Sequence, residues 1–536
     1  MVKRLSLWVC LLALAYAGVM LARSPNWTVD DAYITFRYAD NLARHGQLTW
    51  NVDEDPVEGY TGVALPVLLA GLIRIGVSPI LGSKVIGVVS FFVGGLLLGR
   101  VLSKLGVGSI VRAVIIALYF TAPIMTAHAL SGLETLLFSA SVIASVLALL
   151  TYLEEPGRTE RRASILFALL LFTSFVRPEG VVLAGAFFLA VVFHRKWHRM
   201  ETCRSLAVRF ALFYVLPGMA YFVWRWSYYG LLLPNAFYAK SSGGWNQFHQ
   251  QRQLVDFLNT YVLSLILACA VLVLPSLPRL WRDRREKRIV SHGYPFAIAG
   301  SAALVFMVVS ACQYLRTDPV MNYAYRYYTP FFPLVLIGVG CLLHWGLQAS
   351  ALAWKGRPVR RVVVCAVLVG LCANQVVRYQ AGLRTQLVIM KGYRELLRDV
   401  HIPTGKFLRA CVPPSEWLIV HLDSGAIPYY AGLKTIDFGR LNDETLATNE
   451  LTTEQQADYF YAHNAGAIVI ASRDQHILRP FVGGLGLVRD PRFGGYSFLR
   501  DFGERGYRQC IYLRKDLCEQ YVDSAVEVVP RPVQIR

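Results

Sequence analysis

Two adjacent carboxylates, Asp30 and Asp31, are the residues whose type and position most directly suggest chemistry. They follow the first long apolar run, Leu5 to Leu21, so the chain reaches them just after a stretch suited to lipid. A carboxylate beside another has a shifted pKa and can act as a general base. The alternative is structural: Thr28 or Asp30 caps the helix that follows, and a second acid favours its positive end. The sequence leaves both interpretations open.

A second candidate is the segment Arg177-Pro178-Glu179-Gly180, which interrupts what would otherwise be one long apolar stretch. A charged side chain left in hydrocarbon costs about 2.5–3.5 kcal/mol, and proline breaks a helix. We therefore expect a turn that reaches the membrane surface or a wet cavity. Arg177 is suited to holding a phosphate, but it could equally pair with Glu179 or cap a half-helix.

Two aromatic segments carry further polar candidates. Residues 228–240 begin a long polar loop that contains Tyr229, Asn235 and Lys240; most aromatic residues at such a place are interface anchors, but Asn235 and Lys240 could contact a lipid-linked phosphate or a sugar hydroxyl. Arg326 lies among four tyrosines, a pattern more typical of an interface belt than of a ligand site. Five more residues are candidates for substrate binding, although a lone histidine is more often structural: Glu58, His128, Glu134, Glu179 and Asp423.

The composition identifies the elements that must position these residues. The chain has 536 residues, of which 55% are hydrophobic, and a mean hydropathy of +0.42, so we expect a polytopic membrane protein. The net charge of +19 comes from short basic clusters between apolar runs, which is typical of cytoplasmic loops and argues against a nucleic-acid partner. These clusters lie at residues 2–4, 100–112, 158–162, 194–204, 279–288 and 355–361.

The apolar runs predict about eleven membrane-spanning helices. The first run is interpreted as an anchor, because no clear cleavage site precedes the acidic pair. Residues 63–77 are too short to cross a bilayer of about 30 Å and are predicted as an interfacial or re-entrant helix. The predicted spans are 5–22, 85–102, 110–127, 133–153, 163–176, 180–193, 206–224, 261–278, 293–313, 329–347 and 361–378.

With every basic cluster on the cytoplasmic side, the candidate residues fall on the opposite side of the membrane. The outer segments are then 24–84, 131–134, 177–180, 225–260, 314–328 and everything after about 379. The division predicted is a transmembrane domain, 1–378, whose outer loop 24–84 carries interfacial helices, and a separate domain, 379–536.

The tail is polar enough to fold in water, and its pattern predicts a small α/β domain. Buried strands are expected at 417–420 and 467–470, a helix at 452–463 between them, and a hairpin formed by 496–502 and 508–513. Near the amino terminus, helical spacing predicts an amphipathic helix from Ala32 to His45, ended by Gly46.

Four motifs occur in order: Asp30-Asp31, Ser131-Gly132-Leu133-Glu134, Val176-Arg177-Pro178-Glu179, and Tyr228-Tyr229-Gly230-Leu231 with Pro234 and Lys240. Over the membrane region to about residue 250, their order and spacing resemble the arabinofuranosyltransferases that cap mycobacterial arabinan chains. More broadly, the chain resembles GT-C glycosyltransferases that use polyprenyl-phosphate sugars. The resemblance implies a polytopic α-helical, GT-C-like membrane protein with an extracytoplasmic C-terminal α/β domain, in the bacterial inner (cytoplasmic) membrane.

The resemblance also implies a reaction. A sugar, with arabinofuranose favoured, moves from a polyprenyl monophosphate to a hydroxyl of an extracytoplasmic glycan or protein. Arg177, Lys240 or Arg326 would hold the phosphate, and Asp30 or Asp31 would remove the proton. If configuration is retained, one aspartate would instead be the nucleophile or stabilise an oxocarbenium-like state.

The sequence requires no cofactor. A divalent cation held by Asp30, Asp31 or Glu58 would suit oxygen ligands, but nothing in the spacing demands one. Both aspartates are expected outside the folded core, so that single asparagine replacements would leave the fold intact.

Three other functions stay open. One is transfer of mannose or an aminosugar to protein or lipid. Another is a transporter or flippase for lipid-linked sugars, against which stand the lack of paired halves and of membrane charges other than the Arg-Pro-Glu turn. A structural assembly protein would leave the clustering of acids unexplained.

Overall fold

The computed structural model describes residues 2–154, 159–197, 203–241, 247–274, 293–315, 322–353, 358–473, 478–481, 484–504 and 506–522. The chain forms two compact units. Unit 1 comprises residues 1–25, 83–222 and 245–390, and unit 2 comprises 26–82, 223–244 and 391–536. The boundary at 390 lies near the predicted one at 378, but unit 2 also takes in two segments that precede it in the sequence.

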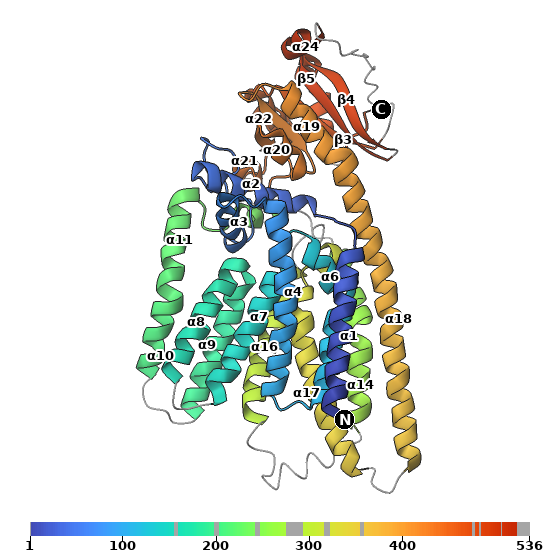
Figure 1. Cartoon of the computed structure of the whole chain (residues 1–536). Helices are drawn as coiled ribbons and strands as arrows, with labels where there is room; N and C mark the ends of the chain where they lie inside the picture. The colour runs from blue at the N-terminus through green and yellow to red at the C-terminus, as the bar shows by residue number, and fades with distance from the viewer. Residues whose placement is uncertain are drawn as a thin grey trace. The chain divides into compact units, whose positions relative to one another are not determined.

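Unit 1 is helical (Figure 1). Helices α4, α11 and α18 continue into unit 2 at one end. The helices are α1 (Val2–Arg23), α4 (Pro79–Lys104), α5 (Ser109–Thr121), α6 (Pro123–Leu130), α7 (Thr135–Glu154), α8 (Thr159–Val176), α9 (Glu179–Trp197), α10 (Cys203–Phe210), α11 (Leu216–Tyr229), α13 (Gln247–Phe257), α14 (Leu263–Val273), α16 (Gly293–Tyr314), α17 (Phe332–Ala353) and α18 (Pro358–Leu396).

Length and composition identify the membrane spans. In the described part of the chain, eight helices are long and apolar enough to cross a membrane, or nine if α5 and α6, bent by 50°, form one span. The eleven predicted segments fall on helices, except that 110–127 is divided between α5 and α6 and that residues 275–278 lie outside the described part. Two of these helices, α8 and α9, are not among the eight or nine spans, and both carry charged residues in an end turn. The basic cluster at 279–288 lies outside the described residues.

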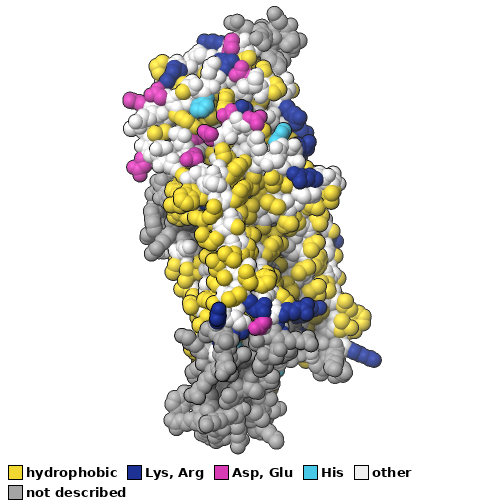
Figure 2. Space-filling view, turned by 90° about the vertical axis from the view of Figure 1, so that its left-hand side faces the viewer, with side chains coloured by type: hydrophobic (Ala, Val, Ile, Leu, Met, Phe, Trp, Pro, Cys, Tyr) yellow, Lys and Arg dark blue, Asp and Glu magenta, His cyan; other side chains and the backbone are white. Residues whose placement is uncertain are grey.

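The outer faces of these helices are apolar. On α4, Val85, Val89 and Val93 recur every four residues and are about half exposed, as expected for side chains that face lipid. Figure 2 shows apolar side chains gathered over the helical part of the chain. The protein is therefore a multi-pass membrane protein, as predicted.

Unit 2 contains a five-stranded mixed sheet in the order β2-β1-β3-β5-β4. The strand β1 (Trp417–His421) pairs in parallel with β2 (Lys434–Asp437) and β3 (Ala467–Ser472). The antiparallel hairpin of β4 (Tyr496–Glu504) and β5 (Tyr507–Arg514) completes it beside β3. The predicted α/β domain, its two strands and its terminal hairpin are confirmed.

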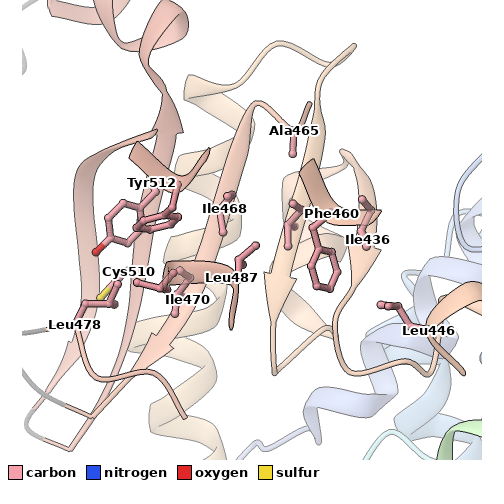
Figure 3. Close-up of a cluster of buried hydrophobic side chains, with 13 residues drawn as sticks. Ile436, Leu446, Phe460, Ala465, Ile468, Ile470, Leu478, Leu487, Cys510 and Tyr512 are labelled. Atoms are coloured by element: carbon pink, nitrogen blue, oxygen red, sulfur yellow. The ribbon is translucent and has the colours of Figure 1, made fainter. Parts of the chain in front are cut away.

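Alternating side chains give this sheet two buried faces. Ile468 and Ile470 pack on one face with Phe460 of α22 (Thr453–Ala462) and Leu487 of α23 (Gly484–Arg489), as Figure 3 shows. Ile419 belongs to the same cluster. The other face is covered by α19 (Ile402–Cys411), α20 (Ala426–Ala431) and α24 (Lys515–Val522). The helix predicted at 452–463 is α22, and Thr452 with Gln455 forms a capping box at its start.

The early segment of unit 2 forms α2 (Asp30–His45) and α3 (Ala64–Arg74). Gly46 ends α2 in the left-handed conformation, as the sequence predicted. The 11-residue α3 is the short apolar helix expected within 63–77. Two further short helices are α12 (Asn235–Ser241) and α21 (Glu444–Thr448).

Asn51 covers the outer edge of the sheet. Its side-chain oxygen accepts from the Thr435 amide at 2.9 Å, and its nitrogen donates to the Thr435 carbonyl at 3.1 Å, as a neighbouring strand would. Asn51→Ala leaves the Thr435 amide unpaired, whereas the Thr435 carbonyl keeps the hydrogen bond from Trp50 Nε1 at 3.0 Å. We therefore expect the free energy of unfolding to fall by about 1–3 kcal/mol. Thermal melting of the full chain measures the loss. Asn449→Ala, which removes an exposed amide from the same unit, is the control, and equal melting of the two variants would contradict the prediction.

Candidate functional site

Asp30 is the centre of a buried polar network in unit 2. Its Oδ1 accepts from Nδ1 of His401 at 2.9 Å and from the Ala426 amide at 3.0 Å, and its Oδ2 accepts from the Gly425 amide at 2.9 Å. The side chain is 11% exposed. The expectation that both carboxylates lie outside the core is thus wrong for Asp30, because its three donors lie inside unit 2.

Asp30 caps a helix, but not its own. Val29 is the N-cap of α2, without a side-chain cap, whereas the Asp30 carboxylate lies at the amino-terminal end of α20. Two turns later, the buried Arg37 donates to the carbonyls of Pro428 and Leu433 at the other end of α20. One acid and one base of α2 therefore meet the positive and the negative end of α20.

His401 links Asp30 to a second carboxylate. Its Nε2 lies 2.9 Å from the Tyr507 hydroxyl, which donates to Asp423. Gln509 Nε2 lies 2.7 Å from the same hydroxyl and 3.1 Å from Asp423 Oδ2. Asp423 follows β1 with a φ of 51°, which a non-glycine residue adopts only at a cost of about 1–3 kcal/mol and which is common at functional sites.

The two carboxylates of this network differ in pKa. Burial alone would raise the pKa of Asp30, but the charge and hydrogen bond of His401 and the two amide donors outweigh it and hold the pKa below its usual value. Burial is the main cause that raises the pKa of Asp423; His401 opposes it and Asp30 adds to it. Paired titratable groups whose pKa values are pushed apart are typical of acid–base sites.

The remaining candidates of unit 2 hold its three segments together. Glu58 forms an ion pair of 2.6 Å with Arg225, and the Tyr229 hydroxyl donates to the Leu48 carbonyl at 2.6 Å. The fully buried Asn235 donates to three carbonyls between residues 440 and 443. Asp31 is partly exposed. Lys240 lies in α12, but its side chain is outside the described part.

Asp443, beside this Asn235 contact, gives unit 2 a pH dependence. It caps α21 and accepts the Tyr459 hydroxyl at 2.9 Å, and burial raises its pKa to about 6. Because the folded pKa exceeds the unfolded value of about 3.9, this group stabilises the fold below about pH 4 and loses that contribution as the pH rises through 6.

Asp443→Asn keeps the capping oxygen without the charge. We therefore expect the variant to melt above the unmodified protein at about pH 8, with the difference vanishing at about pH 4. Melting of the full chain across this range checks it. Asp490→Asn is the control, since hydrogen bonds from Arg492 lower the pKa of Asp490; a gain for Asp443→Asn that is equal at both pH values would contradict the prediction.

In unit 1, the Arg-Pro-Glu turn forms a four-charge cluster. Arg177 binds Glu179 through two hydrogen bonds, of 2.8 and 3.2 Å, and Glu134 at 3.1 Å. Arg326 binds the same Glu134 oxygen at 2.8 Å. The predicted break between α8 and α9 is confirmed. Arg177 is only 2% exposed, whereas the sequence suggested a turn at the membrane surface or in a wet cavity. Burial is possible because two carboxylates neutralise the guanidinium.

Arg326 is held in place by a strained segment. Ala324 and Tyr325 have φ values of 53° and 56°, and the Ala324 carbonyl accepts from Nε2 of His128 at 3.0 Å. His128 thus fixes the backbone beside Arg326. The buried Nε of Arg326 has no hydrogen-bond partner among the described residues, so this guanidinium keeps a donor for a further acceptor.

A metal role for Asp30, Asp31 or Glu58 stays a hypothesis. No group of three or more His, Cys, Asp or Glu residues in the described part of the chain is arranged to hold a metal ion. As they lie, Asp30 receives three N–H donors and Glu58 is paired with Arg225, so an ion would have to displace these contacts. The present arrangement does not fit a metal site.

His401, Tyr507 and Gln509 were missed by the sequence interpretation. They belong to no motif, and 371 residues separate His401 from Asp30. A partial signal was present for Gln509, which lies in the predicted hairpin strand 508–513, and for Tyr507, which directly precedes that strand. Only the packing of α2 against the tail brings these groups to Asp30.

Solved structures of ArnT and of an archaeal oligosaccharyltransferase have a similar fold. ArnT from Cupriavidus metallidurans in the apo state matches with a TM-score of 0.55 at 14% identity, over 95% of this chain and 98% of that one. ArnT bound to undecaprenyl phosphate matches at 0.53 and 12%, over 94% and 97%. The fold is that of the GT-C glycosyltransferases. A third similar structure is the oligosaccharyltransferase of Archaeoglobus fulgidus tethered with an acceptor peptide. It matches with a TM-score of 0.51 at 11% identity, over 93% of this chain and 73% of that one.

Sequence comparison finds similarity to an arabinofuranosyltransferase in part of the chain. A terminal β-(1→2)-arabinofuranosyltransferase of Mycobacterium tuberculosis is 28% identical over 272 residues, which cover 46% of this chain. The match spans 40% of that relative's length. Residues 386–515 match a domain of unknown function, DUF8728.

Proposed function

We propose that this protein transfers a sugar, arabinofuranose, from a polyprenyl monophosphate to a hydroxyl of an extracytoplasmic glycan or protein. The single observation that carries the proposal is the carboxylate of Asp30, held by three donors in a chain with the GT-C fold. The printed name of the mycobacterial relative supports the choice of sugar. The bilayer of the bacterial inner membrane supplies the donor, and the active site and C-terminal domain face the extracytoplasmic side.

Asp30 is the general base of this reaction. A carboxylate has about four acceptor positions, and His401, Gly425 and Ala426 take three of them. The remaining position, on Oδ2, accepts the hydroxyl of the sugar acceptor and takes its proton as the new glycosidic bond forms. Asp31, the more exposed neighbour, holds a second hydroxyl of the acceptor.

The guanidinium groups of unit 1 bind the donor phosphate. In the free protein Arg177 and Arg326 are balanced by Glu134 and Glu179, so the buried cluster is neutral. Arg326 keeps a free Nε–H for a phosphate oxygen, and Arg177 shares Glu134 with it. As the bond to the phosphate breaks, these donors stabilise the growing negative charge. Lys240 is a third candidate for contact with the phosphate.

The test is direct transfer. Purified full-length protein is incubated with synthetic prenyl-phosphoryl arabinofuranose, mannose and an aminosugar, each with an arabinofuranoside acceptor, and products are identified by mass. We expect the acceptor to gain one pentose with the first donor. A product only with mannose or the aminosugar would refute the sugar, and intact donors throughout would refute the transferase.

A further inference from the structure

We propose that Asp30, His401, Tyr507 and Asp423 form a proton relay, in which His401 and Tyr507 are positioning residues for the base and Asp423 receives the displaced proton. This inference rests on the proposed function of Asp30. The four groups come from four separate elements of unit 2: α2, the helical turn Leu397–His401 before α19, strand β5, and the loop after β1. Neighbouring groups along the chain lie within hydrogen-bond distance of each other.

Counting hydrogens fixes the resting state of the relay. The Tyr507 hydroxyl has a single proton, which it donates to Asp423. It therefore accepts from its two other neighbours, Gln509 Nε2 and His401 Nε2. Since His401 also donates from Nδ1 to Asp30, the ring carries both protons and is an imidazolium between two carboxylates.

A second arrangement contains the same number of protons. If the proton on Nε2 of His401 moves to the Tyr507 oxygen, and the original Tyr507 proton moves to Asp423, then His401 and Asp423 both become neutral. Two bonds break, N–H and O–H, and two O–H bonds form, so atoms and charge balance. His401, Tyr507 and Asp423 are already hydrogen-bonded in sequence, so only protons have to move between the two states.

The relay resolves a difficulty in the proposed chemistry. A carboxylate stabilised by an imidazolium is a weak base, and its protonation would leave a buried positive charge without its partner. When Asp30 takes the proton of the acceptor hydroxyl, the shift from His401 to Asp423 removes that positive charge in the same step. The site then holds Asp30 and Asp423 protonated and His401 neutral, and partly exposed Asp423 can release its proton to water.

In the described part of the chain, few other groups face this network. Tyr33 on α2 lies close enough to Asp30 to interact with its charge, and Tyr430 of α20 lies beside Tyr33. Gln509 of β5 contacts both Tyr507 and Asp423. Tyr33, Tyr430 and Gln509 stay neutral at physiological pH, so the charge balance is set by Asp30, His401 and Asp423.

The alternative is that the network only ties α2 to the sheet. Tyr507→Phe distinguishes the two, because it keeps the ring and removes only the relaying oxygen. Tyr496→Phe is the matched control, since this hydroxyl of β4 donates to the Ala465 carbonyl of the same unit. His401→Gln, which keeps a donor for Asp30 but cannot carry a proton onward, provides a second variant.

Kinetics on the full chain with prenyl-phosphoryl arabinofuranose give the first readout. For Tyr507→Phe and His401→Gln we expect kcat to fall by at least about tenfold with KM nearly unchanged, and the pH profile of kcat to shift. His401→Gln should also lower the melting temperature, because it removes the charge paired with Asp30. Tyr496→Phe should match the unmodified enzyme. Unchanged kcat and pH profile in Tyr507→Phe would overturn the relay while leaving the transferase intact.

A readout without turnover separates the two proposals. In full-length protein labelled with ¹⁵N-histidine, the His401 resonances, assigned by their loss in His401→Gln, should show both nitrogens protonated near neutral pH and should change in Tyr507→Phe. A His401 ring with a bare Nε2, or a spectrum that Tyr507→Phe leaves unaltered, would overturn the relay. A chain that transfers no sugar refutes the proposed function, and these spectra still decide the protonation of the network.

Discussion

Asparagine in place of Asp30 is expected to lower sugar transfer by about 10²–10⁴-fold, the usual contribution of a general base. The variant should also destabilise unit 2. An amide presents one oxygen where the carboxylate presents two, so the donors from His401, Gly425 and Ala426 cannot all be satisfied. Breaking a buried ion pair on one side costs about 3–5 kcal/mol.

Transfer of pentose and thermal melting, measured on the same preparation, separate the two effects. Asp40→Asn is the control on the same helix, because Asp40 forms only an exposed pair with Arg44, which contributes little. Asp31→Asn should keep the melting temperature and lose less activity than Asp30→Asn. Transfer at the unmodified rate by Asp30→Asn would remove Asp30 from the chemistry.

Replacement of Arg177 should have the largest effect in unit 1. In Arg177→Met, Glu179 keeps the hydrogen bond from the Tyr314 hydroxyl but loses its counter-charge. Glu134 loses one of the two arginines that contact it and keeps Arg326. An unpaired buried charge costs about 3–5 kcal/mol, so we expect a lower yield of folded protein and a lower melting temperature. Arg209→Ala, which removes an exposed partner of Glu160, should change neither.

A double variant distinguishes the structural from the proposed binding role of Arg177. Arg177→Met with Glu179→Gln removes both charges of the buried pair, so part of the lost stability should return. Binding of polyprenyl phosphate, measured by displacement of a labelled prenyl phosphate, should stay weak in the double variant. Recovery of full donor binding together with stability would show that Arg177 acts only within the cluster.

The helices and the terminal domain were predictable because their signals are local. Apolar runs of bilayer length predict spans wherever they occur, and short continuous apolar runs predict the buried strands at 417–420 and 467–470 without reference to other segments. The α8–α9 break follows from Pro178 and two charges in four residues. These patterns act within one turn or one strand, which a sequence displays directly.

The partners of the candidate residues were not predictable in this way. Asp30 looked like a cap for its own helix or an exposed acid, and the structure has it capping α20, which begins almost 400 residues later. Glu58, Tyr229 and Asn235 are candidate ligand contacts by sequence, and the structure shows that they join three segments of unit 2. A polar side chain carries no mark that distinguishes a buried packing contact from a ligand contact.

The sequence by itself determined which apolar runs are long enough to cross a membrane, four of the five strands of the sheet, and which charged residues had to find partners. Only the tertiary structure decided those partners: His401 for Asp30, Glu134 shared by Arg177 and Arg326, and Arg225 for Glu58. The reason is that a buried charge requires a counter-charge or donor within about 3 Å, and the chain brings such groups together from positions that have no fixed separation in the sequence.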